Sequence, residues 1–125
     1  MDTPKVSVIL CSYNRAAYIP LALQSLVNQN ITPTIFEIIV VDNNSTDDTT
    51  TVCKNFIAAH PQHTIKYLTE IQQGSSFARN TGAAIAKAPL LCFMDDDAVA
   101  APDYIEKIIA FFIQYPQVKI GRAHV

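Results

Sequence analysis

Glycine is scarce in this sequence, and its scarcity excludes two common kinds of nucleotide site. Only 3 of the 125 residues are glycine. Gly74, Gly82 and Gly121 form neither a G-x-G-x-x-G nor a G-x-x-x-x-G-K pattern behind a predicted strand. The usual dinucleotide-binding turn and the P-loop are therefore both excluded. If the protein binds a phosphorylated ligand, the phosphate charge must be neutralised by something other than a glycine-rich cradle, and a metal ion is the expected means.

The sequence also lacks a basic excess. It holds 9 Lys and Arg against 11 Asp and Glu, for a formal net charge of -2, so nucleic-acid binding driven by electrostatics is not expected. Half of the residues are hydrophobic, which suffices for a core and is too apolar for a disordered chain. The length suits one domain or part of one.

Cysteine and long apolar runs are sparse as well. Cys11, Cys53 and Cys92 are odd in number and widely spaced, which predicts free thiols in a reducing compartment rather than disulfides or a zinc site. No apolar run approaches the roughly 18 residues of a membrane span, and the amino terminus lacks the features of a signal peptide. We expect a cytoplasmic protein, with a place at the cytoplasmic face of the membrane left open for a longer parent.

The hydrophobic residues alternate between strand-like and helical spacing along the chain. Short apolar runs predict strands at residues 5–10, 36–41, 64–68 and 90–94. Helical periodicity predicts helices at residues 19–27, 44–60, 75–88 and 105–113, and Ser45 with Asp48 resembles a capping box for the second of them. This order is typical of an α/β protein with a Rossmann-like, mainly parallel sheet covered by helices.

Polar residues gather where three of the predicted strands end. The clusters are "SYNR" at 12–15, "DNNSTDD" at 42–48 and "DDD" at 95–97. Ligands of open α/β sheets bind beyond the carboxyl ends of the strands, so the three clusters are expected to meet. Carboxylates are hard ligands that suit Mg²⁺ or Mn²⁺. On an extended segment Asp95 and Asp97 face the same way, while Asp96 faces elsewhere and could hydrogen-bond a ligand hydroxyl.

Three segments resemble the N-terminal half of a family 2 glycosyltransferase with the GT-A fold. They are "VSVILCSYNR", "EIIVVDNNSTDDT" and "GSSFARNTGAAIAKAPLLCFMDDDA", and the resemblance covers roughly residues 5–115. Cys11 stands where the family usually has proline. The resemblance implies that residues 1–119 are the nucleotide-sugar-binding part of a glycosyltransferase domain.

The resemblance assigns nucleotide binding to five residues, namely Ser12, Tyr13, Asp42, Arg79 and Asp96. Tyr13 would lie against the uracil or other base, and Asp42 would accept a hydrogen bond from the edge of the base. Arg79 would approach the base or the diphosphate. Asp96 would contact the ribose or the sugar.

The resemblance also implies a divalent metal, Mn²⁺ or Mg²⁺, held on the diphosphate by Asp97 with Asp95 directly or through water. The reaction would transfer a sugar from a nucleotide-diphosphate sugar, UDP-sugar first, to a hydroxyl of a glycan, lipid or other acceptor, with inversion, as in polysaccharide biosynthesis. The family's general base comes from the second half of its domain. We therefore expect no catalytic base in this chain, which should lack turnover alone.

The last six residues suggest a different origin from the rest. "IGRAHV", residues 120–125, is what ATCGGAAGAGCACACGTC encodes, and that sequence looks like a common sequencing-library adapter. We expect these residues to be a non-native tail.

Other readings stay open at this stage. "FMDDDAV" also resembles the nucleophile loop of haloacid-dehalogenase-type phosphatases, in which Asp95 would attack phosphorus with Mg²⁺ present. A non-catalytic module that binds a nucleotide is a third possibility. Ser45 and Asp48 are better explained as helix caps than as ligands, and Arg15 is either a phosphate contact or a surface charge.

Overall fold

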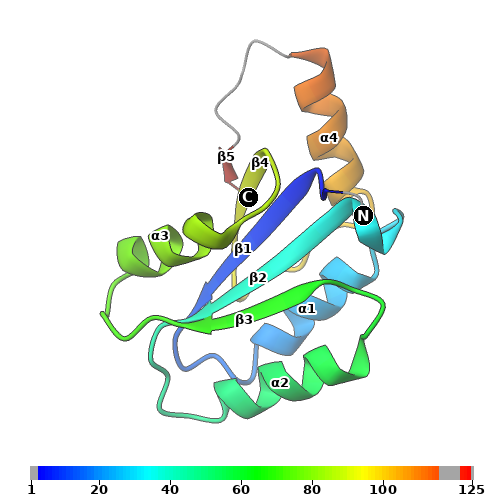
Figure 1. Ribbon diagram of the computed structural model, residues 1–125. Coiled ribbons are helices and arrows are strands. Elements are labelled where there is room, and N and C mark those ends of the chain that lie inside the picture. Colours follow the sequence, from blue (N-terminus) through cyan, green and yellow to red (C-terminus); the bar gives the residue numbers. More distant parts are fainter. Residues whose placement is uncertain (1–2, 116–121, 125) are drawn as a thin grey trace.

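The computed structural model describes residues 3–115 and the backbone of Arg122–His124. The strands are β1 (Val6–Ser12), β2 (Phe36–Asp42), β3 (Ile65–Thr69), β4 (Leu90–Asp95) and β5 (Arg122–His124). The helices are α1 (Ile19–Val27), the 3-10 helix η1 (Pro33–Ile35), α2 (Thr49–Ala59), α3 (Ser75–Ile85) and α4 (Tyr104–Gln114). The strands form one sheet in the order β3-β2-β1-β4-β5, and every neighbouring pair is parallel (Figure 1). The predicted α/β class is confirmed.

The strand register aligns the carboxyl ends of the three central strands, β2, β1 and β4. Ser12 of β1 is paired with Asp42 of β2. On its other side β1 pairs with β4, where Cys11 faces Asp95. The loops that follow these strands therefore leave the sheet at the same edge, as the sequence predicts.

The core has two parts, one on each face of the sheet. Alternate residues of a strand point to opposite faces, so Val8 and Leu10 join one cluster while Ile9 joins the other. The larger cluster lies under α1, α2 and α4, and the smaller one lies under α3 through Ala78. Figure 1 shows α3 alone on its side of the sheet, with α1 and α2 on the other.

The predicted capping box is wrong. Helix α2 begins at Thr49 with Asp48 at the N-cap position, and the Asp48 side chain makes no capping hydrogen bond, while the Thr49 N–H donates to Asp47 Oδ1 at 2.9 Å. The hydroxyl of Ser45 instead accepts a hydrogen bond from the backbone N–H of Asn14, 2.9 Å away. The local pattern suggested a cap, but this side chain is used to join two loops that are far apart in sequence.

Helix α3 also ends earlier than predicted, at Ile85 instead of residue 88. The backbone of Ala86 is extended, and the next N–H, that of Lys87, donates to the carboxylate of Glu37 at 2.7 Å. A buried acceptor on β2 therefore turns the chain out of the helix.

The predicted tail at residues 120–125 falls largely outside the described residues. Of it, only the backbone of β5 is described, in parallel pairing with β4. That pairing does not test where these residues come from, so the tail stays a prediction. Among the residues that the structure describes, no helix has the length and apolar character needed to cross a membrane.

Candidate functional site

Asn14 joins the loop after β1 to the loop after β2. Its backbone N–H donates to Ser45 Oγ at 2.9 Å, and its side-chain oxygen accepts from the N–H groups of Thr46 and Asp47 at 2.8 and 3.2 Å. Asp47 returns a contact by accepting from Ala16 N–H at 3.2 Å. Asn14 has a φ of 52°, a left-handed conformation that Asn adopts more readily than most residues. The first two polar clusters are thus one connected surface.

Asp42 lies beneath this surface with a carboxylate that is already hydrogen-bonded. Its exposure is 1%. One carboxylate oxygen accepts from Ser45 N–H at 2.9 Å, and the other accepts from Tyr67 Oη at 2.5 Å and Thr50 Oγ1 at 3.1 Å. Burial alone would raise the pKa of Asp42, but these hydrogen bonds outweigh it and lower the pKa. The predicted contact of Asp42 with a base edge therefore stays a prediction.

A cavity of about 280 Å³ opens beside these loops. Its lining comes from the end of β1, the end of β2 and the segment before α3: Cys11, Ser12, Tyr13, Asn43, Gln73, Gly74 and Ser75. The cavity brings together two predicted site residues, Ser12 and Tyr13, and the Tyr13 side chain is exposed. Sequence reasoning missed Asn43 and residues 73–75. The available signals were the position of Asn43 next to Asp42 and a lone glycine, Gly74, before a helix.

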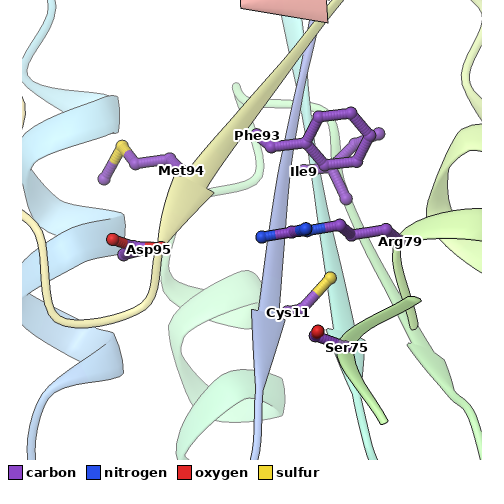
Figure 2. Close-up of a pocket in the computed structure, with 7 residues that line it drawn as sticks. All are labelled: Ile9, Cys11, Ser75, Arg79, Phe93, Met94 and Asp95. Atoms are coloured by element: carbon purple, nitrogen blue, oxygen red, sulfur yellow. The ribbon is translucent and has the colours of Figure 1, made fainter. Parts of the chain in front are cut away.

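A second cavity, of about 120 Å³, lies between β1, β4 and α3. It is lined by Ile9, Cys11, Ser75, Arg79, Phe93, Met94 and Asp95. Figure 2 shows the Arg79 side chain reaching from α3 toward β1, and its guanidinium carbon lies 5.9 Å from the centre of the Phe93 ring. The structure thus places Arg79 and Asp95 on one cavity. Cys11 borders both cavities, and burial raises the pKa of its thiol to about 11.

The three aspartates after β4 differ in their surroundings. Asp95 and Asp97 are exposed, whereas Asp96 is partly buried. Arg15 Nε lies 3.9 Å from Asp96 Oδ2, so Arg15 is paired with a predicted site residue. Burial raises the pKa of Asp96, while the nearby Ser12 hydroxyl and Arg15 oppose the rise. Ser12 Oγ is itself buried, and it makes no hydrogen bond of good geometry to any atom in the described part of the chain.

The exposed pair fits one class of metal site. Within residues 3–115 no group of three or more His, Cys, Asp or Glu side chains gathers closely enough to hold a metal ion. Mg²⁺ and similar ions usually take one or two protein carboxylates and complete their shell with water and phosphate oxygens. Asp95 and Asp97 form no salt bridge in the described part of the chain, which leaves both carboxylates available as such ligands.

The chain belongs to glycosyltransferase family 2. The model of the family described as Glycosyl transferase family 2 matches residues 7–124. The chain is 37% identical over 109 residues to validoxylamine A glucosyltransferase of Streptomyces hygroscopicus subsp. limoneus, covering 86% of this chain and 23% of that protein. It is 35% identical over 104 residues to glycosyltransferase AglE of Haloferax volcanii, covering 83% of this chain and 34% of the relative.

Solved structures agree with this assignment. The mannosyltransferase PcManGT from Pyrobaculum calidifontis, in complex with GDP-Man and Mn²⁺, superposes with a TM-score of 0.83 at 27% identity. S. aureus TarS 1-349 in complex with UDP superposes with a TM-score of 0.81 at 28% identity. Each match covers 90% of this chain and 33% of the other. The GT-A fold is thereby confirmed, the phosphatase alternative is not favoured, and the chain spans about a quarter to a third of the length of these proteins.

Proposed function

We propose that this chain forms the donor-binding part of a glycosyltransferase that moves a sugar from a nucleoside-diphosphate sugar to an acceptor hydroxyl. The observation that carries the proposal is the meeting of three loops at one edge of the sheet. The loops after β1 and β2 are hydrogen-bonded together through Asn14, and the loop after β4 reaches the first of them through Arg15 and Asp96.

Each part of this edge suits a different part of the donor. We place the base in the larger cavity, against Tyr13, and the diphosphate beside the exposed carboxylates of Asp95 and Asp97. These two carboxylates would hold a Mn²⁺ or Mg²⁺ ion, which would supply positive charge for the leaving diphosphate. Arg79, on the second cavity with Asp95, would add positive charge to the same region. Asp96 would accept a hydrogen bond from a donor hydroxyl.

Two findings on similar proteins support this donor class. TarS has been solved with UDP and with UDP-GlcNAc, and PcManGT with GDP-Man and Mn²⁺. We propose a UDP-sugar first, and a glycan, lipid or other hydroxyl acceptor. The base that deprotonates the acceptor is not assigned to a residue of this chain. We also propose a cytoplasmic location, which the three free cysteines support.

Titration calorimetry with UDP tests the proposal directly. UDP should bind in the presence of Mn²⁺, and removal of the metal with EDTA should weaken binding by at least about tenfold, because the diphosphate loses its counter-charge. Asp97→Asn should cause a similar loss. Asp103→Asn is the matched control, because Asp103 is paired with Lys107 on α4 and should leave UDP affinity unchanged.

Two results would contradict the proposal. One is UDP binding that is equally tight with and without metal. The other is release of phosphate from a phosphomonoester that disappears in Asp95→Asn, which would revive the phosphatase reading with Asp95 as nucleophile.

A further inference from the structure

Asn43 uses its whole side-chain amide to hold the segment at residues 70–74. Its exposure is 6%. The amide nitrogen donates to the carbonyl oxygens of Glu70 and Gln72, at 2.9 and 2.8 Å. The amide oxygen accepts from Gly74 N–H at 2.9 Å. Both N–H donors and one acceptor site of this side chain are therefore hydrogen-bonded to the backbone of one short segment.

The backbone of Asn43 is fixed on both sides. Its N–H donates to the carbonyl of Ser12 at the end of β1, at 2.8 Å, and its carbonyl accepts from Gln73 Nε2 at 2.7 Å. The adjoining carbonyl of Asp42 accepts from Glu70 N–H at 2.9 Å. Asn43 thus connects the end of the central strand with segment 70–74.

The held segment forms a wall of the larger cavity. Gln73, Gly74 and Ser75 line that cavity together with Tyr13. Gly74 has a φ of 137°, which only glycine adopts without strain, and it is the N-cap residue of α3. The same helix carries Arg79 onto the second cavity. The position of Gly74 therefore sets where the wall stands relative to Tyr13.

We propose that Asn43 is a positioning residue for the nucleobase: it fixes wall 73–75 at the spacing from Tyr13 that a base requires. This inference rests on the proposed function, which places the base in that cavity. The chemistry requires an amide. A carboxylate at position 43 could accept from Gly74 N–H, but it would face the carbonyl oxygens of Glu70 and Gln72 without a proton to donate. Preorganised walls of this kind lower the cost of ordering on binding.

Asn43→Asp tests the inference by comparing two ligands in the presence of Mn²⁺. UDP affinity should fall by about tenfold or more, the effect of losing two buried hydrogen-bond donors. Pyrophosphate affinity should change by less than about twofold, because Asp95 and Asp97 belong to β4 and its loop and not to the wall. Asn55→Asp adds the same charge at an exposed position of α2 and should change neither affinity.

Equal losses for UDP and pyrophosphate would overturn the inference, since they would indicate general damage to the fold. Unchanged UDP affinity would overturn it too. The proposed function fails separately, if the wild-type protein does not bind UDP with Mn²⁺, and that result is known before a variant is made.

Hydrogen exchange of the wild-type protein gives a test that does not require the variant to fold. The Gly74 amide should exchange as slowly as the amides of β2, because Asn43 holds it, and Asn43→Asp should accelerate it selectively if the variant is folded. Rapid exchange of Gly74 in the wild-type protein would overturn the inference.

Discussion

Glu37 is a buried carboxylate at the end of the sheet opposite the three polar loops. It accepts hydrogen bonds from Ser7 Oγ at 2.5 Å, Lys87 N–H at 2.7 Å and Lys66 Nζ at 2.8 Å. Ser7 also accepts from Ala88 N–H at 3.2 Å. The group ties the turn between α3 and β4 to the first two strands. A buried charge that is paired in this way is costly to break from one side only.

Glu37→Gln should therefore destabilise the protein by about 2–4 kcal/mol, because Lys66 loses its partner and the amide cannot accept all three hydrogen bonds. Urea unfolding followed by circular dichroism measures the change. Glu106→Gln, at an exposed position of α4, is the control and should stay within about 0.5 kcal/mol of wild type. Equal stabilities of the two variants would show that the Glu37 cluster contributes no net free energy.

At the residue scale, the sequence predicted the place of the site better than it predicted the role of each residue in it. Tyr13, Arg79 and Asp95 do line cavities at the predicted edge. The importance of Asn43 was missed because its partners, such as Gly74, lie about thirty residues away and only folding brings them together. The sequence left the role of Arg15 undecided for the same reason, because its pairing with Asp96 joins two loops that are distant in the sequence.

Among the elements, α3 depends on one close approach to the sheet. A Cβ atom at Gly82 would lie 2.7 Å from Ile9 Cγ2 and 3.1 Å from Val41 Cγ2. Both of these side chains are fully buried in the core cluster beneath the helix. Gly82 therefore serves close packing and not backbone freedom, because its φ is not positive. The approach holds α3, and with it Arg79, against β1 and β2.

Gly82→Ala should push α3 away from the sheet and destabilise the protein by about 1–3 kcal/mol, the usual cost of overpacking. It should also weaken UDP binding, since Ser75 and Arg79 move with the helix. Thermal unfolding and calorimetry measure the two effects. Asn80→Ala, at an exposed position of α3, should leave both nearly unchanged. A Gly82→Ala protein as stable as wild type would mean that the side chains of Ile9 and Val41 can move away from the added methyl group without a cost in free energy.

The elements themselves were largely predictable because hydrophobic spacing is local. Each predicted strand is present, and no strand boundary differs from its predicted position by more than two residues. The errors occurred where a distant residue competes for a local group. Ser45 bonds to Asn14 instead of capping α2, and Lys87 bonds to Glu37 instead of extending α3.

At the scale of the whole molecule, two buried carboxylates make the free energy of unfolding depend on pH. Burial alone would raise the pKa of Glu37 and of Asp42, but their hydrogen bonds lower both pKa values below the ordinary 4.5 and 3.8. Such groups stabilise the fold fully above their ordinary pKa, and the contribution is lost as the pH falls through the lowered value. Burial also lowers the pKa of His63 from 6.5, which has the same sign. Asp96, whose pKa is raised, opposes them.

The free energy of unfolding should therefore be highest near neutral pH, decline slightly as the pH drops below 6.5 and decline more steeply below about 4.5. Urea midpoints measured between pH 7 and pH 3 follow this change. In Glu37→Gln the decline below pH 4.5 should be shallower, because one of the carboxylates with a lowered pKa is gone. A midpoint that rises toward pH 3 would contradict the assignment.

The sequence by itself determined the alternation of strands and helices, the family and the edge at which the polar loops meet. Those features follow from local periodicity and from the rule that parallel strands end at a common edge. Only the tertiary structure decided which polar groups at that edge are already used. The carboxylate of Asp42 and the amide of Asn43 are taken up by internal partners, while Asp95 and Asp97 stay exposed. Hydrogen bonds between residues that are distant in the sequence form only on folding, so no local sequence pattern predicts them.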